Sequence, residues 1–237
     1  MFDFTDQVVM ITGATGNLGQ AVARAFTAAN AAVVLVARSE VGIRKALPDL
    51  IALPNTLITP ADLTNLESVQ SAVNAALRAF GRLDVLANTV GGYKAGDPVH
   101  TTPIETWDFM LELNARTALV ISKAVIPTML GQGHGAIIHT ASRAGLSGGK
   151  NAAAYSAAKS AVIRLTESLA AELKHSDINV NCVLPGTIDT PENRAAMPNA
   201  RHEHWVSPEA IAQVILFLAS DAAHAVHGAA IPVYGLS

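Results

Sequence analysis

The chain has 237 residues, 50% of them hydrophobic, and its 16 basic and 19 acidic residues give a net charge of −3. This length suits one large core, so residues 1–237 are expected to form a single domain. No basic block is present, which argues against a nucleic-acid partner. No apolar stretch reaches the roughly 18 residues that span a bilayer, and the first residues lack the basic segment of a signal peptide. We therefore expect a cytoplasmic protein with no membrane partner.

Short β-branched runs alternate with alanine-rich segments of helical period, which is the pattern of βαβ units around a parallel sheet. Strands are predicted at 7–12, 31–38, 56–63, 83–88, 135–142, 178–186 and 229–235. Helices are predicted at 18–30, 65–81, 105–130, 153–174 and 207–220. Pro127 is expected to bend or disturb the last turn of the 105–130 helix. The sequence thus predicts an α/β, doubly wound, Rossmann-type fold, with a mostly parallel seven-stranded sheet and helices on both faces. The polar segment at 190–206, which prolines interrupt, is predicted to be a loop over the site.

The stretch TGATGNLG lies between the first predicted strand and the first predicted helix. Its glycines have the spacing G-x-x-G-x-x-G instead of the usual G-x-G-x-x-G. The first glycine permits a tight turn, the third permits close packing of the helix on the sheet, and the free N–H groups of the helix face a pyrophosphate. A purely structural glycine turn is the alternative, but the strand–turn–helix context favours a dinucleotide site. The residues predicted to bind cofactor here are Gly13, Thr15, Gly16, Asn17, Leu18 and Gly19.

The type of cofactor is decided at the end of the second predicted strand, which has the sequence Ala37-Arg38-Ser39-Glu40. An acidic residue there binds the ribose 2′-hydroxyl of NAD, whereas an arginine offers a planar donor group for a 2′-phosphate. Arg38 could instead be a solvated side chain, and Glu40 could take the acidic role, although it lies further into the following helix. We predict that NADP(H) is preferred and that NAD(H) is possible.

The stretch SRAGLSGGKNAAAYSAAKS contains three residues suited to carbonyl chemistry. Tyr155 and Lys159 lie four positions apart on one helical face, and Ser142 ends a strand. Hydride transfer to a carbonyl carbon requires a proton for the oxygen, and a free tyrosine, with a pKa of about 10, is a poor proton donor and acceptor at neutral pH. We expect the Lys159 ammonium to lower the Tyr155 pKa and Ser142 to hydrogen-bond the substrate oxygen. Such a Tyr-x-x-x-Lys pair alone is usually structural, but here it follows a nucleotide loop.

Together these motifs resemble the short-chain dehydrogenase/reductase family over essentially the whole chain. The resemblance implies that Asn114 in LELNART anchors a proton-relay water and completes the catalytic group with Ser142, Tyr155 and Lys159. It also implies that two helices, at 105–130 and 153–174, form the interface of a homodimer or homotetramer. Further cofactor contacts implied by the resemblance are Asp62, Leu63, Asn88, Tyr155, Lys159, Pro185, Gly186, Ile188 and Thr190. The chain departs from the family in LANTVGG, where only Asn88 matches, and in a last strand without Asp-Gly-Gly.

The resemblance implies an oxidoreductase that transfers a hydride between NAD(P)(H) and a small carbonyl or alcohol. The stretches GGYKAG and GTIDTPENRAAMPNARHEHW are similar to dihydropteridine reductases, which makes reduction of a quinonoid pterin the alternative. A nucleotide-sensing protein without catalysis ranks third, because all three catalytic side chains are present. Alternate residues of the RHEHW loop do not supply the converging ligands of a metal site, so no metal is expected. Candidate substrate contacts are Tyr93, Arg143, His204 and Trp205.

Overall fold

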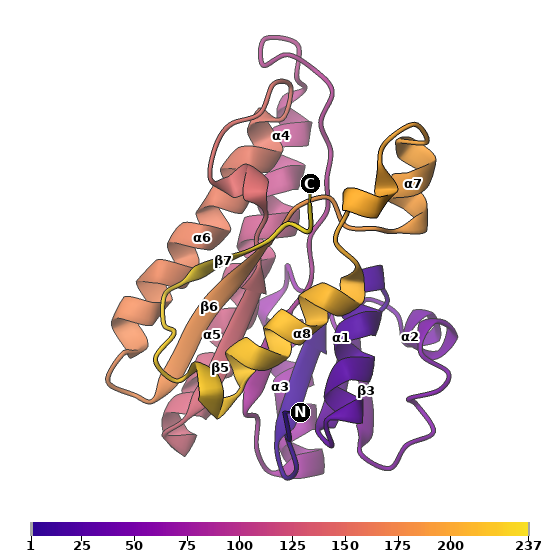
Figure 1. Ribbon diagram of the computed structural model, residues 1–237. Coiled ribbons are helices and arrows are strands. Elements are labelled where there is room, and N and C mark those ends of the chain that lie inside the picture. Colours follow the sequence, from indigo (N-terminus) through magenta and orange to yellow (C-terminus); the bar gives the residue numbers. More distant parts are fainter. Residues whose placement is uncertain (1, 237) are drawn as a thin grey trace.

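The computed structural model describes residues 2–236, which form one sheet of seven strands (Figure 1). The strand order is β3-β2-β1-β4-β5-β6-β7, and each pair of neighbours is parallel. The order reverses beside β1, and in doubly wound sheets ligands bind outside the carboxyl ends of the strands at such a switch point. The strands are β1 Val8–Thr12, β2 Ala32–Ala37, β3 Thr56–Pro60, β4 Val85–Asn88, β5 Gly135–Thr140, β6 Ile178–Pro185 and β7 Ala230–Val233. The expected Rossmann-type sheet is therefore confirmed.

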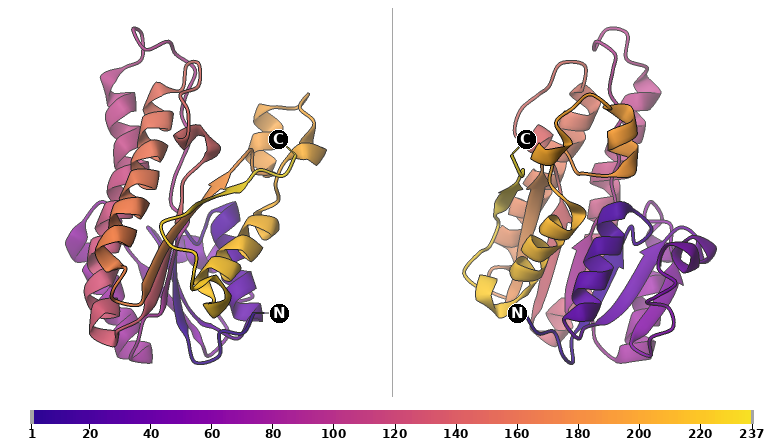
Figure 2. Two further views of the ribbon diagram at one scale, coloured as in Figure 1. Left: turned by 60° about the vertical axis from the view of Figure 1, so that its left-hand side comes forward. Right: turned by 45° about the vertical axis from the view of Figure 1, so that its right-hand side comes forward.

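Helices cover both faces of the sheet, as Figure 2 shows for the indigo and yellow helices on one side and the magenta to orange helices on the other. Alternate residues of β1 belong to different cores: Val9 and Ile11 pack in one, and Val8 and Met10 in the other. Because both faces are covered, the strands are apolar at successive positions. One face carries α1 Asn17–Ala28, α2 Glu40–Ala46 and α8 Pro208–Ala219, and the other carries α3 Leu66–Phe80, α5 Thr117–Gln132 and α6 Ala153–Leu173.

The helix predicted at 105–130 is divided in the structure into three parts. The α-helix α4 Ile104–Leu111 continues into a π-helical turn, Glu112–Arg116, and then into α5. The Asn114 side chain stabilises the wide turn, since its amide donates to the Met110 carbonyl at 3.0 Å and to the Gly92 carbonyl at 3.2 Å. Pro127 does not end the helix, because α5 runs past it to Gln132. Gly133, with a left-handed backbone (φ 76°), caps α5 by donating to the Met129 and Leu130 carbonyls.

The segment predicted as a loop at 190–206 contains α7 Pro191–Ala196 and a 3-10 turn, His202–His204. Thr190 is the N-cap of α7, because its side chain accepts a hydrogen bond from the Asn193 N–H at 3.2 Å, and a proline follows it at the first helical position. A parallel bridge between Ile188 and Val206 closes the base of the segment. Figure 1 shows α7 beyond the carboxyl edge of the sheet. The loop prediction was therefore wrong about its internal structure.

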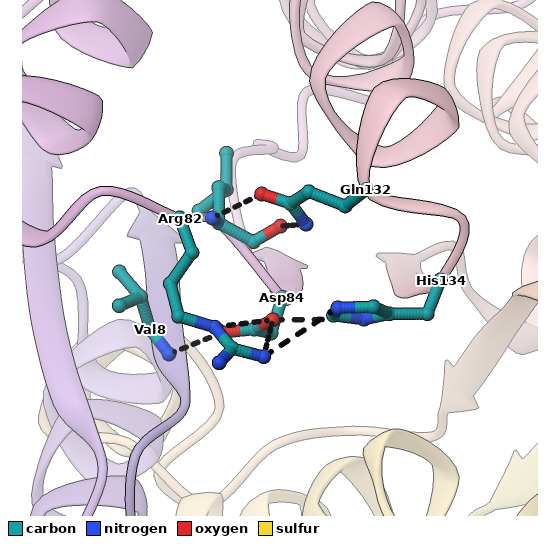
Figure 3. Close-up of polar contacts among 6 residues, drawn as sticks. Val8, Arg82, Asp84, Gln132 and His134 are labelled. Atoms are coloured by element: carbon teal, nitrogen blue, oxygen red, sulfur yellow. Dashed lines mark hydrogen bonds and ion pairs between the residues drawn. The ribbon is translucent and has the colours of Figure 1, made fainter.

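The amino-terminal edge of the sheet carries a buried carboxylate, Asp84, which precedes β4 (Figure 3). Asp84 accepts hydrogen bonds from the Val8 N–H at 2.7 Å and from the Arg82 guanidinium at 2.9 Å, and His134 lies 3.6 Å away. The carboxylate raises the pKa of Arg82, chiefly through these hydrogen bonds. Asp84 thus joins the start of β1 to the start of β4 beside a cavity of about 310 Å³.

Among residues 2–236, no helix is both long and apolar enough to cross a membrane.

Candidate active site

Most of the predicted cofactor residues lie at the carboxyl edge of the sheet, in the connections that follow β1, β2, β3 and β6. Gly13 has a φ of +70°, which a residue with a side chain rarely adopts. A Cβ on Gly19 would overlap the Gly13 carbonyl oxygen. Gly16 is the N-cap of α1 and offers no side-chain oxygen to its N–H groups. The turn is suited to a phosphate group, because the first N–H groups of α1 receive no hydrogen bond from the side chain of the N-cap residue.

The end of β2 presents Arg38 as an exposed side chain near Asp62. The pKa of Asp62 is lowered mainly by hydrogen bonds from the Thr64 N–H and hydroxyl, and to a smaller extent by the charge of Arg38. Glu40, the acidic alternative to Arg38, instead accepts hydrogen bonds from Arg44 at 2.7 and 2.9 Å, one turn along α2. Arg38 is thus the positively charged side chain at the end of β2, and Glu40 is paired with Arg44 within α2.

Asn88 is the last residue of β4, and its side chain is buried among the strand ends at this edge. It accepts from the Thr12 hydroxyl at 2.6 Å and donates to His139 Nδ1 at 3.1 Å, inside the sheet. Because Nδ1 is the acceptor, we assign the ring proton to Nε2, which lies 3.1 Å from the Ser122 hydroxyl. Burial lowers the pKa of His139 to about 4 and keeps the ring neutral. The Asn88 side chain is therefore a core group.

Several other predicted contacts are also buried or occupied. The side chains of Leu18 and Leu63 belong to the two hydrophobic cores, so only their backbones are available to a ligand. The Thr190 hydroxyl caps α7, as described above. The remaining predicted contacts after β6, Pro185, Gly186 and Ile188, lie between the strand end and the bridge to Val206.

The four predicted catalytic side chains converge on the chain after β4. The Ser142 hydroxyl lies near the Tyr155 phenol, whose pKa it lowers. Lys159 is 4% exposed, and its Nζ donates to the Thr140 carbonyl at 2.9 Å. A Cβ on Gly91 would lie 2.8 Å from Lys159 Nζ and 2.9 Å from Asn114 Oδ1. The structure therefore brings Lys159 and Asn114 to one glycine, with Tyr155 one helical turn before Lys159.

The electrostatics of this group differ from the expectation. Burial raises the pKa of Tyr155, the hydrogen bond from Ser142 partly offsets this, and Tyr93 adds a small further increase. Burial lowers the pKa of Lys159 to about 8. The predicted lowering of the Tyr155 pKa is thus wrong for this arrangement, because desolvation of the phenol outweighs the favourable contacts. At neutral pH Tyr155 is a phenol and Lys159 is largely an ammonium.

The candidate substrate residues fall into two sets. Tyr93 packs edge-to-face against Tyr155, with ring centroids 4.8 Å apart at 83°. Arg143 follows Ser142 directly, and its guanidinium lies 5.3 Å from the centre of the Tyr234 ring. Trp205 instead packs on His202 of its own segment at 4.5 Å, and the His204 carbonyl accepts from the Leu236 N–H at 2.8 Å.

The sequence analysis missed two residues beside this site, Thr140 and Tyr234. Thr140 contributes a backbone carbonyl to Lys159, and no side-chain pattern marks such a role. Tyr234 follows the last strand, where its aromatic character alone would have been the signal. Within residues 2–236, no group of three or more His, Cys, Asp or Glu side chains is placed to hold a metal ion.

Comparisons with known proteins agree with this geometry. The family model for short chain dehydrogenases matches residues 7–201. A cis-4-hydroxycyclohexanecarboxylate dehydrogenase of Sinomonas cyclohexanicum is 36% identical and the match covers 98% of this chain and 96% of the relative. An uncharacterized oxidoreductase of Staphylococcus aureus (strain USA300) is 31% identical, over 93% of this chain and 94% of its own.

Among solved structures, a short-chain type dehydrogenase/reductase from Mycobacterium ulcerans superposes with a TM-score of 0.93 at 29% identity. The superposition covers 99% of this chain and 90% of the other. Three findings agree: the family model matches most of the chain, the relatives match nearly its full length, and the solved structure shares its fold. The chain belongs to the short-chain dehydrogenase/reductase family of oxidoreductases.

Proposed function

We propose that this protein is an NADP(H)-dependent oxidoreductase that interconverts a small carbonyl compound and its alcohol, with Tyr155 as the proton donor and acceptor. The observation that carries the proposal is the meeting of Lys159 and Asn114 beside Gly91, at the sheet edge that also carries the glycine turn. Tyr155 lies one helical turn before Lys159, with Ser142 next to it. Members of this family bind NAD(P) nucleotides, and a glycine turn between a strand and a helix, as at Gly13 and Gly19, suits a pyrophosphate.

When bound, NADP(H) supplies or accepts the hydride. In the reducing direction, the neighbouring Ser142 and Tyr155 hydroxyls bind the carbonyl oxygen together. Tyr155 gives its proton to this oxygen as negative charge develops there, and the Lys159 ammonium stabilises the phenolate that remains. Asn114, fixed to Met110 and Gly92, holds the backbone on which Lys159 packs. In the oxidising direction the same proton returns from the alcohol to Tyr155.

The cofactor would be held by the turn around Gly13–Gly19, by Arg38 and Asp62, and by the chain from Pro185 to Thr190. Arg38 supports the preference for NADP(H), because a guanidinium pairs well with a 2′-phosphate and Glu40 is already paired with Arg44. NAD(H) remains a second cofactor in this proposal. Of the substrate candidates, Tyr93 packs on Tyr155 and Arg143 follows Ser142 in the chain, whereas His204 and Trp205 belong to the 190–206 segment.

The name of the Sinomonas relative describes a dehydrogenase of a hydroxylated cyclohexane acid. We therefore place alicyclic alcohols and ketones first among the candidate substrates. The relatives and the solved structure described above are not named for pterins, so the pterin alternative gains no support.

We also propose a cytoplasmic homodimer or homotetramer that uses the face of α4, α5 and α6. This face carries a cavity of about 540 Å³, whose lining includes Leu111, Leu119, Ala161 and Leu165. Half-exposed Leu119 and the apolar floor are typical of a surface that another subunit covers. Sedimentation of a monomer at micromolar concentration would remove this part of the proposal.

The experiment is a steady-state assay of the purified protein with NADPH or NADH and a panel of ketones, against Tyr155→Phe. We expect turnover with NADPH and a loss of at least about a hundredfold in kcat for the variant, because the proton donor is missing. Ser156→Ala is the matched control: the Ser156 hydroxyl is buried one residue away and makes no hydrogen bond within the described residues. Full activity of Tyr155→Phe would overturn the role of Tyr155, and the absence of turnover with the whole panel would overturn the proposed function.

A further inference from the structure

Tyr93 is an exposed aromatic residue in direct contact with the proposed proton donor. Its side chain is 70% exposed, yet its ring packs edge-to-face on Tyr155 with centroids 4.8 Å apart. Folding does not require a large aromatic side chain to stay exposed to solvent beside a reactive hydroxyl. The Tyr93 side chain is instead placed to contact whatever binds to the Tyr155 hydroxyl.

The chain before Tyr93 is fixed by the catalytic residues themselves. Asn114 Oδ1 accepts from the Gly92 N–H at 3.1 Å, and its amide donates to the Gly92 carbonyl at 3.2 Å. Both glycines pass close to neighbouring side chains: a Cβ on Gly91 would lie 2.8 Å from Lys159 Nζ, and one on Gly92 would lie 2.6 Å from Leu113 Cδ2. The backbone is thus held against Asn114 and Lys159, so the position of Tyr93 is coupled to that of the catalytic group.

We propose that Tyr93 is a substrate-positioning residue that selects carbonyl compounds and alcohols whose reacting carbon belongs to a ring. This inference rests on the function proposed above. A substrate oxygen that is bonded to the Tyr155 hydroxyl places its carbon skeleton beside the Tyr93 ring, because the two tyrosine rings touch.

A ring gains more from this contact than an open chain does. An alicyclic or aromatic ring covers the face of a tyrosine with a rigid surface, and stacking contributes beyond the area that is buried. An open chain of the same size must lose rotational freedom to make the same contact, which offsets much of the gain. Tyr93 therefore favours the ring in binding, while the proton transfer itself stays with Tyr155.

The test compares cyclohexanone with 2-hexanone, which have the same number of carbon atoms, in the wild type, Tyr93→Phe and Tyr93→Ala. We expect Tyr93→Ala to raise KM for cyclohexanone by about five- to tenfold, with less than about a twofold change for 2-hexanone. Tyr93→Phe should keep the wild-type ratio of the two kcat/KM values, because the ring is retained. The decrease in kcat near the pKa of Lys159 should be the same in all three proteins, since Tyr93 does not contribute to that pKa.

Val99→Ala is the matched control, because Val99 is also an exposed apolar residue of the segment between β4 and α4. Thermal unfolding of each variant shows that the fold is intact. If Tyr93→Ala lowers kcat/KM equally for both ketones, or for neither, the inference is overturned and the proposed function still stands. A loss in Tyr93→Phe as large as in Tyr93→Ala would also overturn it, because the hydroxyl and not the ring would then be responsible. If the wild type reduces no ketone at all, the proposed function fails and this inference fails with it.

Discussion

At the scale of single residues, Lys159 sets the expected pH dependence of catalysis. Burial lowers its pKa to about 8, and the proposed mechanism needs its positive charge. Burial raises the pKa of Tyr155, so the phenol keeps its proton throughout this range. The rate of ketone reduction should therefore be level at lower pH and fall as the pH rises through about 8, where Lys159 loses its proton.

The measurement is kcat/KM for ketone reduction between about pH 6 and pH 10, at saturating NADPH. Lys159→Arg is the comparison, because a guanidinium keeps its charge across this range. Whatever activity this variant retains should no longer fall near the pKa of Lys159. A wild-type rate that increases through this range would show that the neutral amine is the active form.

Arg38 carries the prediction about cofactor choice. Its exposed guanidinium lies at the end of β2, and Arg38→Ala should raise KM for NADPH by roughly ten- to a hundredfold, because a charge-assisted bond to the 2′-phosphate is lost. KM for NADH should change little. Arg44→Ala is the control, since Arg44 pairs with Glu40 on the same helix. If KM changes equally for NADPH and NADH, Arg38 does not bind the 2′-phosphate.

Residue positions that depend on short-range spacing could be predicted from the sequence. Tyr155 and Lys159 share a helical face, and Gly13 follows a strand, so local geometry alone brings them to one edge. Asn88 could not be placed in this way, because its buried contacts with Thr12 and His139 come from two other strands. The pKa of Tyr155 also depends on burial by distant elements, which spacing along the chain does not reveal.

At the scale of elements, α7 is connected to the glycine turn by one polar contact. Asn17, the first residue of α1, donates from Nδ2 to Glu192 Oε2 at 2.9 Å. This contact places a carboxylate at the helix end where the pyrophosphate is proposed to bind. Glu192→Gln keeps an acceptor for Asn17 and removes the negative charge.

We expect Glu192→Gln to bind NADPH about two- to threefold more tightly at low ionic strength, and the difference should shrink as salt screens the charges. A fluorescence titration of NADPH at two salt concentrations measures both effects. Glu203→Gln, at an exposed glutamate of the same segment, is the control for a general change in charge. Weaker or unchanged binding would mean that the Glu192 carboxylate lies away from the cofactor phosphates.

The same elements show where prediction from sequence ends. The strands were predicted well, because apolar β-branched runs buried on both faces form them regardless of distant contacts. In the π-helical turn at Glu112–Arg116, Asn114 bonds to Gly92, which lies 22 residues earlier in the chain. The periodicity of the sequence does not reveal this contact and predicted one continuous helix. In 190–206, prolines and polar residues suggested a loop, whereas Thr190 and Pro191 start a short helix there.

At the scale of the whole molecule, the two edges of the sheet differ in role. The carboxyl edge gathers the groups proposed for catalysis, and the amino edge gathers contacts that hold strands together. Asp84 is the centre of the second set: it is 4% exposed and accepts from Val8 of β1 and from Arg82 (Figure 3). Asp84→Ala should lower the free energy of unfolding by about 2–3 kcal/mol, since the Val8 N–H loses its partner in a buried place.

For a chain of this size the predicted loss corresponds to a decrease of about 5–10 °C in Tm, measured by calorimetry or circular dichroism. KM for NADPH and the ketone should stay unchanged, because the carboxyl edge is untouched. Asp177→Asn is the control at the same cavity: its ion pair with His224 is exposed and contributes little, and asparagine tolerates the φ of 53° at this position. If Asp84→Ala unfolds at the wild-type temperature, the strands are held together by their hydrophobic cores alone. If Asp84→Ala instead loses activity while its Tm is unchanged, the amino edge of the sheet is coupled to the active site. The connection would run through β4, whose last residue, Asn88, bonds to Thr12 and His139.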